Sequence, residues 1–367
     1  MIYRAIGLMS GSSLDGLDIV FAEFTENAGN WNFEIMAADC YEYAPEWKEK
    51  LQEAIKLNAQ DYQLLHTAYG HYLGEQVNAF IDANNLHYKV GLVASHGHTT
   101  FHIPAQKMTA QLGDGAAIAA TVKLPVISDL RALDVAFGGQ GAPIVPIGEK
   151  LLLKEYGLFL NLGGIANISF NIPEKYTAFD VCPANRVLNL ICNTVEKEFD
   201  DGGEMASRGQ IHDELLKRLN GLDYYSLPFP KSLSNDFGTD TIFPLIDSYG
   251  LAATDSLRTY TEHIVQQLKT SILSSSYSIQ STSSSNKLLV TGGGAFNRFL
   301  IERLSQELAE AGIVVVVPDE NLVKYKEALV MALIGVLRWR QEYTTLSSVT
   351  GAERDSIGGA LWNGQEA

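Results

Sequence analysis

Two segments of the form strand, glycine turn, strand constrain the fold of this chain more than any other feature. The first has predicted strands over residues 3–8 and 17–24 around a Gly/Ser turn at 9–16, and the second has strands over 158–162 and 165–171 around Gly163-Gly164. Tight glycine turns between short apolar runs predict β-hairpins. Because the same unit returns about 150 residues later, we predict a duplicated fold.

Strands alternate with helices along the rest of the sequence. Apolar spacing predicts helices over 46–84, 114–121, a long segment that Thr254 caps, 296–311 and 327–340, and strands over 90–95, 125–128, 287–290 and 313–317. Such alternation is typical of an α/β fold with mixed sheets. Residues 271–286 are rich in serine and lack an apolar period, which predicts a surface loop and not a domain boundary. A length of 367 residues favours two domains.

Composition excludes several classes of partner. The net charge is −16 and the pI about 4.9, so the surface repels phosphate backbones and anionic lipid, and we expect neither nucleic acid nor membrane as a partner. The three cysteines, Cys40, Cys182 and Cys192, fit no zinc spacing and are interpreted as free thiols in a reducing compartment. The N-terminus has no signal-peptide pattern, and the apolar run 328–337 is too short to span a bilayer. We therefore expect a cytoplasmic protein.

Three glycine turns that follow apolar strands, at Gly11, Gly163-Gly164 and Gly292–Gly294, indicate where chemistry takes place. Glycine lets backbone N–H groups approach a ligand, and ligands bind at strand ends in α/β sheets. Each turn alone has a plain structural interpretation, but three together favour a phosphate site. None matches a Walker A loop or a dinucleotide fingerprint.

Polar side chains surround the first of these turns. The hydroxyls of Ser10, Ser12 and Ser13 can donate to phosphate. Asp15 and Asp18 can hold Mg²⁺ through water, since this ion keeps several waters; the alternative is that they cap the turn.

The opening run, residues 7–18, resembles the phosphate-binding start of the anhydro-N-acetylmuramic acid kinases, and the resemblance extends over essentially the whole chain. Further matching segments follow in the family's order: residues 95–99 (Ser-His-Gly-His-Thr), 138–146 (Gly-Gly-Gln-Gly-Ala-Pro-Ile-Val-Pro), 161–167 (Asn-Leu-Gly-Gly-Ile-Ala-Asn), 230–232 (Pro-Lys-Ser), 291–297 (Thr-Gly-Gly-Gly-Ala-Phe-Asn), 327–328 (Glu-Ala) and 349–352 (Val-Thr-Gly-Ala).

This resemblance implies two ribonuclease-H-like domains of the actin/hexokinase/Hsp70 type with an ATP cleft between them. Domain I would comprise residues 1–130 plus approximately 345–367, and domain II residues 131–344. The family reaction opens the 1,6-anhydro ring of 1,6-anhydro-N-acetylmuramic acid and phosphorylates O6, with ATP and Mg²⁺ as cofactors. Its product is N-acetylmuramic acid 6-phosphate, an intermediate in cell-wall recycling. The partners would be the amino sugar, ATP and a second copy of the chain in a homodimer.

The resemblance also assigns roles to residues. Asp180 would be the catalytic base. His96, Arg131, Asn185 and Glu327 would contact the sugar. The nucleotide and its metal would be bound by the three glycine turns, through Gly11, Ser12, Ser13, Leu14, Asp15, Gly16, Leu17, Asp18, Gly163, Gly164, Gly292, Gly293 and Gly294.

Several of these assignments have alternatives. Arg131, which could hold the lactyl carboxylate of the sugar, could instead form a surface ion pair. Glu327 could cap the start of its helix. His96 and His98 form a His-x-His pair, but without a third ligand nearby a metal site is disfavoured against sugar binding or a structural role.

The sequence departs from the family at two places. The family's Asp-Thr-Gly-Pro-Gly-Asn loop reads Asp-Val-Cys-Pro-Ala-Asn over residues 180–185, and His98 replaces a usual glutamine. The loss of both glycines matters if Cys182 or Ala184 must adopt a left-handed backbone. Two other functions therefore stay open: a kinase for another anhydro- or amino sugar, and a nucleotide-binding regulator without turnover.

Overall fold

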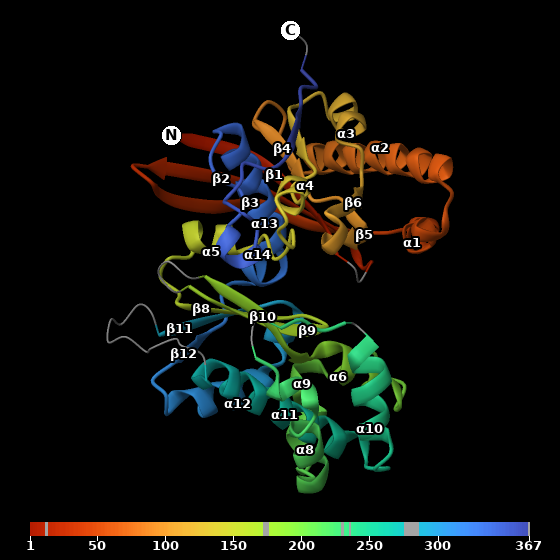
Figure 1. Cartoon of the computed structure of the whole chain (residues 1–367), viewed down its shortest axis with the longest axis vertical. Helices are drawn as coiled ribbons and strands as arrows, with labels where there is room; N and C mark the ends of the chain where they lie inside the picture. The colour runs from red at the N-terminus through yellow and green to blue at the C-terminus, as the bar shows by residue number, and fades with distance from the viewer. Residues whose placement is uncertain (12–13, 172–175, 229–230, 235, 275–285, 366–367) are drawn as a thin grey trace. The chain divides into compact units, whose positions relative to one another are not determined.

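The computed structural model describes residues 1–11, 14–171, 176–228, 231–234, 236–274 and 286–365. The chain forms two compact units, shown in Figure 1, which we call unit 1 (Met1–Leu153 with Tyr325–Ala367) and unit 2 (Lys154–Lys324).

The sheet of unit 1 is built around the first predicted hairpin, and its strands run in the order β13-β7-β4-β1-β2-β3. Strand β1 pairs antiparallel with β2 and parallel with β4, while β2 pairs antiparallel with β3 and β4 pairs parallel with β7. The strand bounds are β1 (Ile2–Ser10), β2 (Gly16–Asn27), β3 (Asn30–Glu42), β4 (Leu92–Ser95), β7 (Val126–Ser128) and β13 (Ala360–Trp362).

The sheet of unit 2 repeats this arrangement, in the order β10-β9-β8-β11-β12. Strand β8 pairs antiparallel with β9 and parallel with β11, while β9 pairs antiparallel with β10 and β11 pairs parallel with β12. The strand bounds are β8 (Leu158–Leu162), β9 (Ile165–Phe170), β10 (Thr177–Pro183), β11 (Lys287–Thr291) and β12 (Val314–Val316). The predicted duplication is therefore confirmed, and both units have the ribonuclease-H-like strand order.

Helices cover both faces of the unit 1 sheet. Ile6 and Leu8 of β1 point into a core shared with Tyr69 of α2 (Ala59–Ala83), which packs beside α3 (Gly115–Val122). On the other face α13 (Glu320–Trp339) lies so close to β1 that a Cβ on Gly7 would collide with the Ala328 carbonyl oxygen. This close approach fixes the position of α13, and with it Glu327, against the first hairpin.

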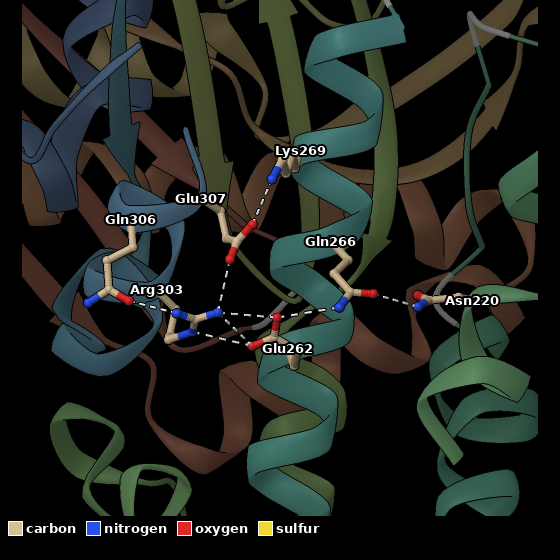
Figure 2. A network of polar contacts seen from close by, with 7 residues as sticks. All are labelled: Asn220, Glu262, Gln266, Lys269, Arg303, Gln306 and Glu307. Carbon is tan, nitrogen blue, oxygen red and sulfur yellow. Dashed lines mark hydrogen bonds and ion pairs between the residues drawn. The ribbon is translucent and has the colours of Figure 1, made fainter. Parts of the chain in front are cut away.

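Unit 2 has its core between the sheet and α6 (Asn185–Asn193), α8 (Asp213–Asn220), α11 (Ala253–Ser274) and α12 (Arg298–Ala309), which gather on one side of the sheet in Figure 1. A half-buried polar network holds three of these helices together (Figure 2). Arg303 of α12 lies 3.2 Å from Glu262 of α11, and Lys269 lies 2.7 Å from Glu307. Gln266 accepts a hydrogen bond of 2.8 Å from Asn220 at the end of α8.

Further helices and strands complete the described structure. They are α1 (Pro45–Glu53), η1 (Ala54–Lys56), β5 (His98–Ile103), η2 (Pro104–Gln106), β6 (Met108–Leu112), α4 (Ala132–Ala136), α5 (Pro146–Leu152), η3 (Asp201–Gly203), α7 (Glu204–Arg208), α9 (Asp223–Ser226), η4 (Phe237–Ile242), α10 (Phe243–Asp247), η5 (Gly293–Phe296) and α14 (Ser347–Thr350).

The compact units divide the chain at other positions than those the sequence suggested. Residues 131–153 and 325–344, which we expected in domain II, lie in unit 1. The physical reason is the packing of α13 on β1 and a buried ion pair of 2.8 Å between Lys326 of α13 and Glu149 of α5. Neither contact connects residues that are close in sequence.

Some local predictions also need correction. Helix α11 begins at Ala253, so Thr254 lies inside its first turn and does not cap it. Helix α13 begins at Glu320, seven residues before the expected start. Of the serine-rich segment, residues 271–274 form the last turn of α11, and residues 275–285 lie outside the described residues. No helix in the described ranges has the length and hydropathy needed to cross a membrane.

Candidate active site

The first glycine turn joins β1 to β2, and the structure gives several of its residues a structural role. A Cβ on Gly16 would lie 2.6 Å from Cys40 Sγ, so the close approach of β2 to β3 requires glycine there. The Leu17 side chain is buried in the core, and Leu14 is buried with a left-handed φ of 58°. Gly11 accepts a hydrogen bond from Leu14 N at 3.4 Å. Ser12 and Ser13, which we expected to bind phosphate, lie outside the described residues.

A group of carboxylates lies beside this turn. Asp18 is part of β2, which rules out the alternative that it caps the turn. The pKa of Asp18 is raised to about 6, mainly by burial and also by the nearby Glu327 and Asp15, while a hydrogen bond from the Cys40 thiol opposes the increase. Burial also raises the pKa of Glu327. Glu327 lies well inside α13, so the alternative that it caps the helix is wrong.

This carboxylate group fits a magnesium ion that is bound mainly through water and phosphate. Within the described ranges, no cluster of three or more His, Cys, Asp or Glu side chains could hold a metal by itself. Mg²⁺ usually takes only one or two carboxylates and keeps several waters. The charges of Glu327 and Asp15 raise the pKa of Asp18, and a cation would relieve this repulsion, so Asp15 and Asp18 remain suitable ligands.

Two histidines are buried next to the same strands. The His96 Nδ1 atom lies 2.9 Å from the Gly97 carbonyl, which can only accept, so Nδ1 carries the proton and Nε2 is left as an acceptor. Burial, together with Arg131 and His98, lowers the pKa of His96 to about 4, which keeps the ring neutral at pH 7. His98 Nδ1 lies 3.1 Å from Ser10 Oγ, which accepts a hydrogen bond from Tyr43.

Arg131 does not form the surface ion pair that was its alternative. Its Nε donates to the Gly141 carbonyl at 2.7 Å and its Nη1 donates to Thr99 Oγ1 at 3.1 Å. Its Nη2 lies 3.2 Å from His102 Nε2. The side chain is partly buried, and the part of the chain that the structure describes offers it no carboxylate within ion-pair distance. A cation among neutral partners is suited to an incoming carboxylate.

Hydrogen bonds hold both the backbone and the carboxylate of Asp180. It lies at a bulge in β10, its amide donates to the Lys231 carbonyl at 3.0 Å, and its carbonyl accepts from the Tyr224 hydroxyl at 2.6 Å. The carboxylate Oδ2 accepts from Leu233 N at 2.9 Å. Burial raises the pKa of Asp180, and the hydrogen bond from Leu233 opposes this.

The carboxylate of Asp180 is not neutralised by the nearest lysine. The Lys231 ammonium donates instead to the Tyr224 carbonyl at 3.0 Å and lies 4.5 Å from the centre of the Tyr224 ring. Over the described ranges, no ion pair involves Asp180. An oriented carboxylate with a raised pKa and without a counter-ion is what a general base requires. Tyr224 and Leu233 are far from Asp180 in sequence, and no motif marks them, so sequence analysis missed both.

The loop after Asp180 has no left-handed residue at the two positions where the family has glycine. Neither Cys182 nor Ala184 has a left-handed backbone, and φ of Ala184 is −128°. Both side chains are buried in the unit 2 core. Ala184 N donates to the Gly164 carbonyl at 2.8 Å and Asn185 N to the Gly163 carbonyl at 3.1 Å. The two departures are therefore absorbed by the core, and the loop stays attached to the second glycine turn.

The second and third glycine turns meet at adjacent strand ends, because Asn161 of β8 pairs with Thr291 of β11. Asn185 lies against both turns. Its Nδ2 donates to the carbonyl of Leu162, which precedes the second turn, at 2.9 Å. Its Oδ1 lies against Gly294 of the third turn, where an added Cβ would be 2.9 Å away. Asn185, which we expected to bind the sugar, thus also has a structural role.

The glycines of these turns are of two kinds. Gly292 has φ of +82°, and a Cβ on Gly294 would lie 2.7 Å from Leu162 Cβ, so the fold itself requires both. Gly163, Gly164 and Gly293 have no left-handed φ, and an added Cβ would meet no atom closer than 3.5, 3.7 and 3.7 Å respectively. Neither backbone conformation nor packing explains these three glycines. They remain the candidates for close contact with a ligand.

Comparison with known proteins gives one consistent result. The family model "Anhydro-N-acetylmuramic acid kinase" matches residues 3–364. The chain is 31% identical to the anhydro-N-acetylmuramic acid kinase of Clostridioides difficile over 97% of each chain. It is also 31% identical to that of Hydrogenovibrio crunogenus, over 98% of this chain and 97% of the other. A weaker likeness, with 12% identity and a TM-score of 0.47, covers 90% of this chain and 96% of (R)-2-hydroxyglutaryl-CoA dehydratase component A of Acidaminococcus fermentans.

The match to the family model leaves only the first two and the last three residues outside. Both relatives are covered almost completely as well. The chain therefore belongs to the anhydro-N-acetylmuramic acid kinase family and is an ATP-using sugar kinase.

Proposed function

We propose that this kinase uses water and ATP to convert 1,6-anhydro-N-acetylmuramic acid into N-acetylmuramic acid 6-phosphate, a step in cell-wall recycling. The observation that carries this proposal is the state of Asp180. Its carboxylate is fixed by Leu233 N, its pKa is raised by burial, and its neighbour Lys231 is turned towards carbonyl groups. These features orient the carboxylate and make it a stronger base than an ordinary aspartate.

The reaction can be balanced with this one base. Water attacks C1 of the sugar and gives its proton to Asp180 as the C1–O bond forms. The C1–O6 bond breaks, and O6 takes the γ-phosphoryl group as the bond from that phosphorus to the ADP oxygen breaks. General-base assistance of this kind typically contributes about 10²- to 10⁴-fold. The charge that develops on O6 passes to the phosphoryl group, so no separate acid is needed.

Other residues would bind and orient the substrates. The Arg131 guanidinium would pair with the lactyl carboxylate, and neutral His96 would accept a hydrogen bond from a sugar hydroxyl through Nε2. Gly163-Gly164 would contact the phosphates and Gly293 the adenosine. Mg²⁺ held near Asp15 and Asp18 would neutralise charge on the phosphate oxygens.

The direct test measures ADP release with and without 1,6-anhydro-N-acetylmuramic acid. We expect release only with the sugar and only with Mg²⁺. In ¹⁸O-labelled water, the label should enter C1 of the sugar and not the phosphate ester. The anhydro bridge occupies the β face of C1, so the first product should be the α-anomer. Label in free phosphate with an unopened sugar would show ATP hydrolysis instead and would refute the proposal.

A second candidate is a kinase for another anhydro- or amino sugar. It is favoured by one observation, the hydrogen-bonding contact between His98 and Ser10, at a position where the family usually has glutamine. A panel of anhydro sugars in the same assay separates the two candidates. Release of ADP with none of them would favour a nucleotide-binding regulator.

A further inference from the structure

We propose that Arg186 is a ligand of the β- and γ-phosphates of ATP, a role that rests on the proposed function and adds a charged residue to its nucleotide site. Arg186 is in the first turn of α6, directly after Asn185, and its side chain is partly buried. Its Nε is inaccessible to solvent and has no hydrogen-bond partner in the part of the chain that is described. A buried guanidinium N–H without a partner is unfavourable, so the structure leaves a donor that a ligand can satisfy.

The position of this donor connects it to the second glycine turn. An added Cβ on Gly164 would lie 3.7 Å from Arg186 Nε and 3.8 Å from Arg186 Cβ, so the arginine side chain begins beside this glycine. Gly164 is one of the glycines that neither φ nor packing requires. The open backbone of the turn and the unpaired guanidinium group therefore lie together.

Electrostatics explains why the ligand should be an anion. The first turn of α6 contains no acidic residue, and the positive end of a helix disfavours a cation there. Arg298, the first residue of α12, also lies in the first turn of a helix, but a Glu204 carboxylate oxygen lies 3.9 Å from it. Among the residues with described positions, no carboxylate is within ion-pair distance of Arg186. The positive end of α6 and the Arg186 guanidinium therefore both place positive charge beside the second glycine turn, without a carboxylate from the described residues to balance it.

A phosphate chain fits this group better than a carboxylate does, because it has more oxygens to accept hydrogen bonds. Arginine binds either anion through two parallel N–H donors, and the glycine turn supplies further backbone donors suited to the additional phosphate oxygens. An arginine that contacts the transferred group also stabilises charge in phosphoryl transfer. The carboxylate of the sugar is the other anion in the reaction, and the experiment separates it from the nucleotide.

The test is titration calorimetry of ATP, ADP, AMP and the sugar against wild type, Arg186→Met and Arg186→Lys. Loss of a hydrogen bond between charged groups should weaken ATP binding by about 10- to 100-fold in Arg186→Met. ADP binding should weaken too, and AMP binding should not change. Arg186→Lys should be intermediate, because lysine keeps the charge and loses the paired donors. Arg208→Met, which removes an exposed arginine of α7 in the same unit, is the matched control and should bind all four ligands normally.

Three results would overturn the assignment. Unchanged ATP affinity in folded Arg186→Met would show that Arg186 does not contact phosphate. A loss confined to the sugar would assign Arg186 to the sugar carboxylate. An equal loss for AMP would show that the substitution disturbs the nucleoside site. Because binding is measured without turnover, the absence of sugar-dependent ADP release would count against the proposed reaction alone.

Discussion

Replacing Asp18 with asparagine should stabilise unit 1 above pH 6 while it impairs Mg²⁺-dependent activity. The reason is that burial raises the pKa of Asp18 from 3.8 to about 6, with Glu327 and Asp15 adding to the effect. In the folded protein the carboxyl group resists ionisation. Ionisation of Asp18 therefore costs no unfolding free energy below pH 3.8, where the carboxyl group is protonated in both states. The stability that the protonated form provides is lost as the pH rises through 6.

The size of the effect follows from the difference between the two pKa values. A difference of about two pKa units corresponds to about 3 kcal/mol of unfolding free energy at pH 8, since each unit is worth about 1.36 kcal/mol. At pH 5 the unfolded state is mostly ionised and the folded state mostly protonated, so the penalty is roughly half as large. Asparagine does not titrate, and the stability gained by Asp18→Asn should show this pH dependence.

The assay is urea unfolding in the absence of metal and nucleotide, followed by tryptophan fluorescence. All four tryptophans, Trp31, Trp47, Trp339 and Trp362, lie in unit 1, as does Asp18, so the signal reports the relevant unit. Equal slopes against urea would show that the variant and wild type expose the same surface on unfolding.

A matched control replaces Asp39, an exposed carboxylate of β3 next to Cys40, with asparagine. This change should alter the unfolding free energy by less than about 0.5 kcal/mol at either pH. A gain in Asp18→Asn that is the same at pH 5 and pH 8, or no gain at all, would refute the reasoning about burial. Full Mg²⁺-dependent activity of this variant would remove Asp18 from the metal site.

Three further predictions concern unit 2. Asp180→Asn should lower sugar-dependent ADP release by at least about 100-fold with ATP affinity unchanged, and near-normal turnover of the variant would exclude Asp180 as the base. In the wild type, kcat/KM should fall with decreasing pH at a pKa above the usual aspartate range, because burial raises the pKa of Asp180. Gly293→Val should fold and lose ATP binding in calorimetry, since the added Cβ meets no atom closer than 3.7 Å; normal ATP affinity would exclude Gly293 from the adenosine site. Tyr225→Phe should lower the unfolding free energy by about 1–3 kcal/mol, because buried His263 Nε2 loses its contact with the tyrosine hydroxyl 2.9 Å away. Urea unfolding followed by circular dichroism measures this, and an unchanged midpoint would contradict it.

The sequence alone was sufficient for features that depend on near neighbours in the chain. The hairpins β1–β2 and β8–β9 form where apolar runs flank a glycine turn, and turn chemistry acts over a few residues. Asp180 was predicted as the base from the resemblance of its loop, residues 180–185, to the family's loop, a comparison that also involves only neighbouring residues. Edge strand β3 was not predicted: apart from Trp31 its side chains are exposed or only partly buried, so it lacks the continuous buried run of its neighbour β2.

Only the tertiary structure decided what each of these residues can do. Asp180 has its available carboxylate because Tyr224 and Leu233, more than 40 residues away, hold its carbonyl and its Oδ2 atom. Glu327 lies beside Asp18 because Gly7 lets α13 approach β1, and that packing also assigns the segment 325–344 to unit 1. Burial and pKa depend on which distant segments pack together, and packing between distant segments leaves no local pattern in the sequence.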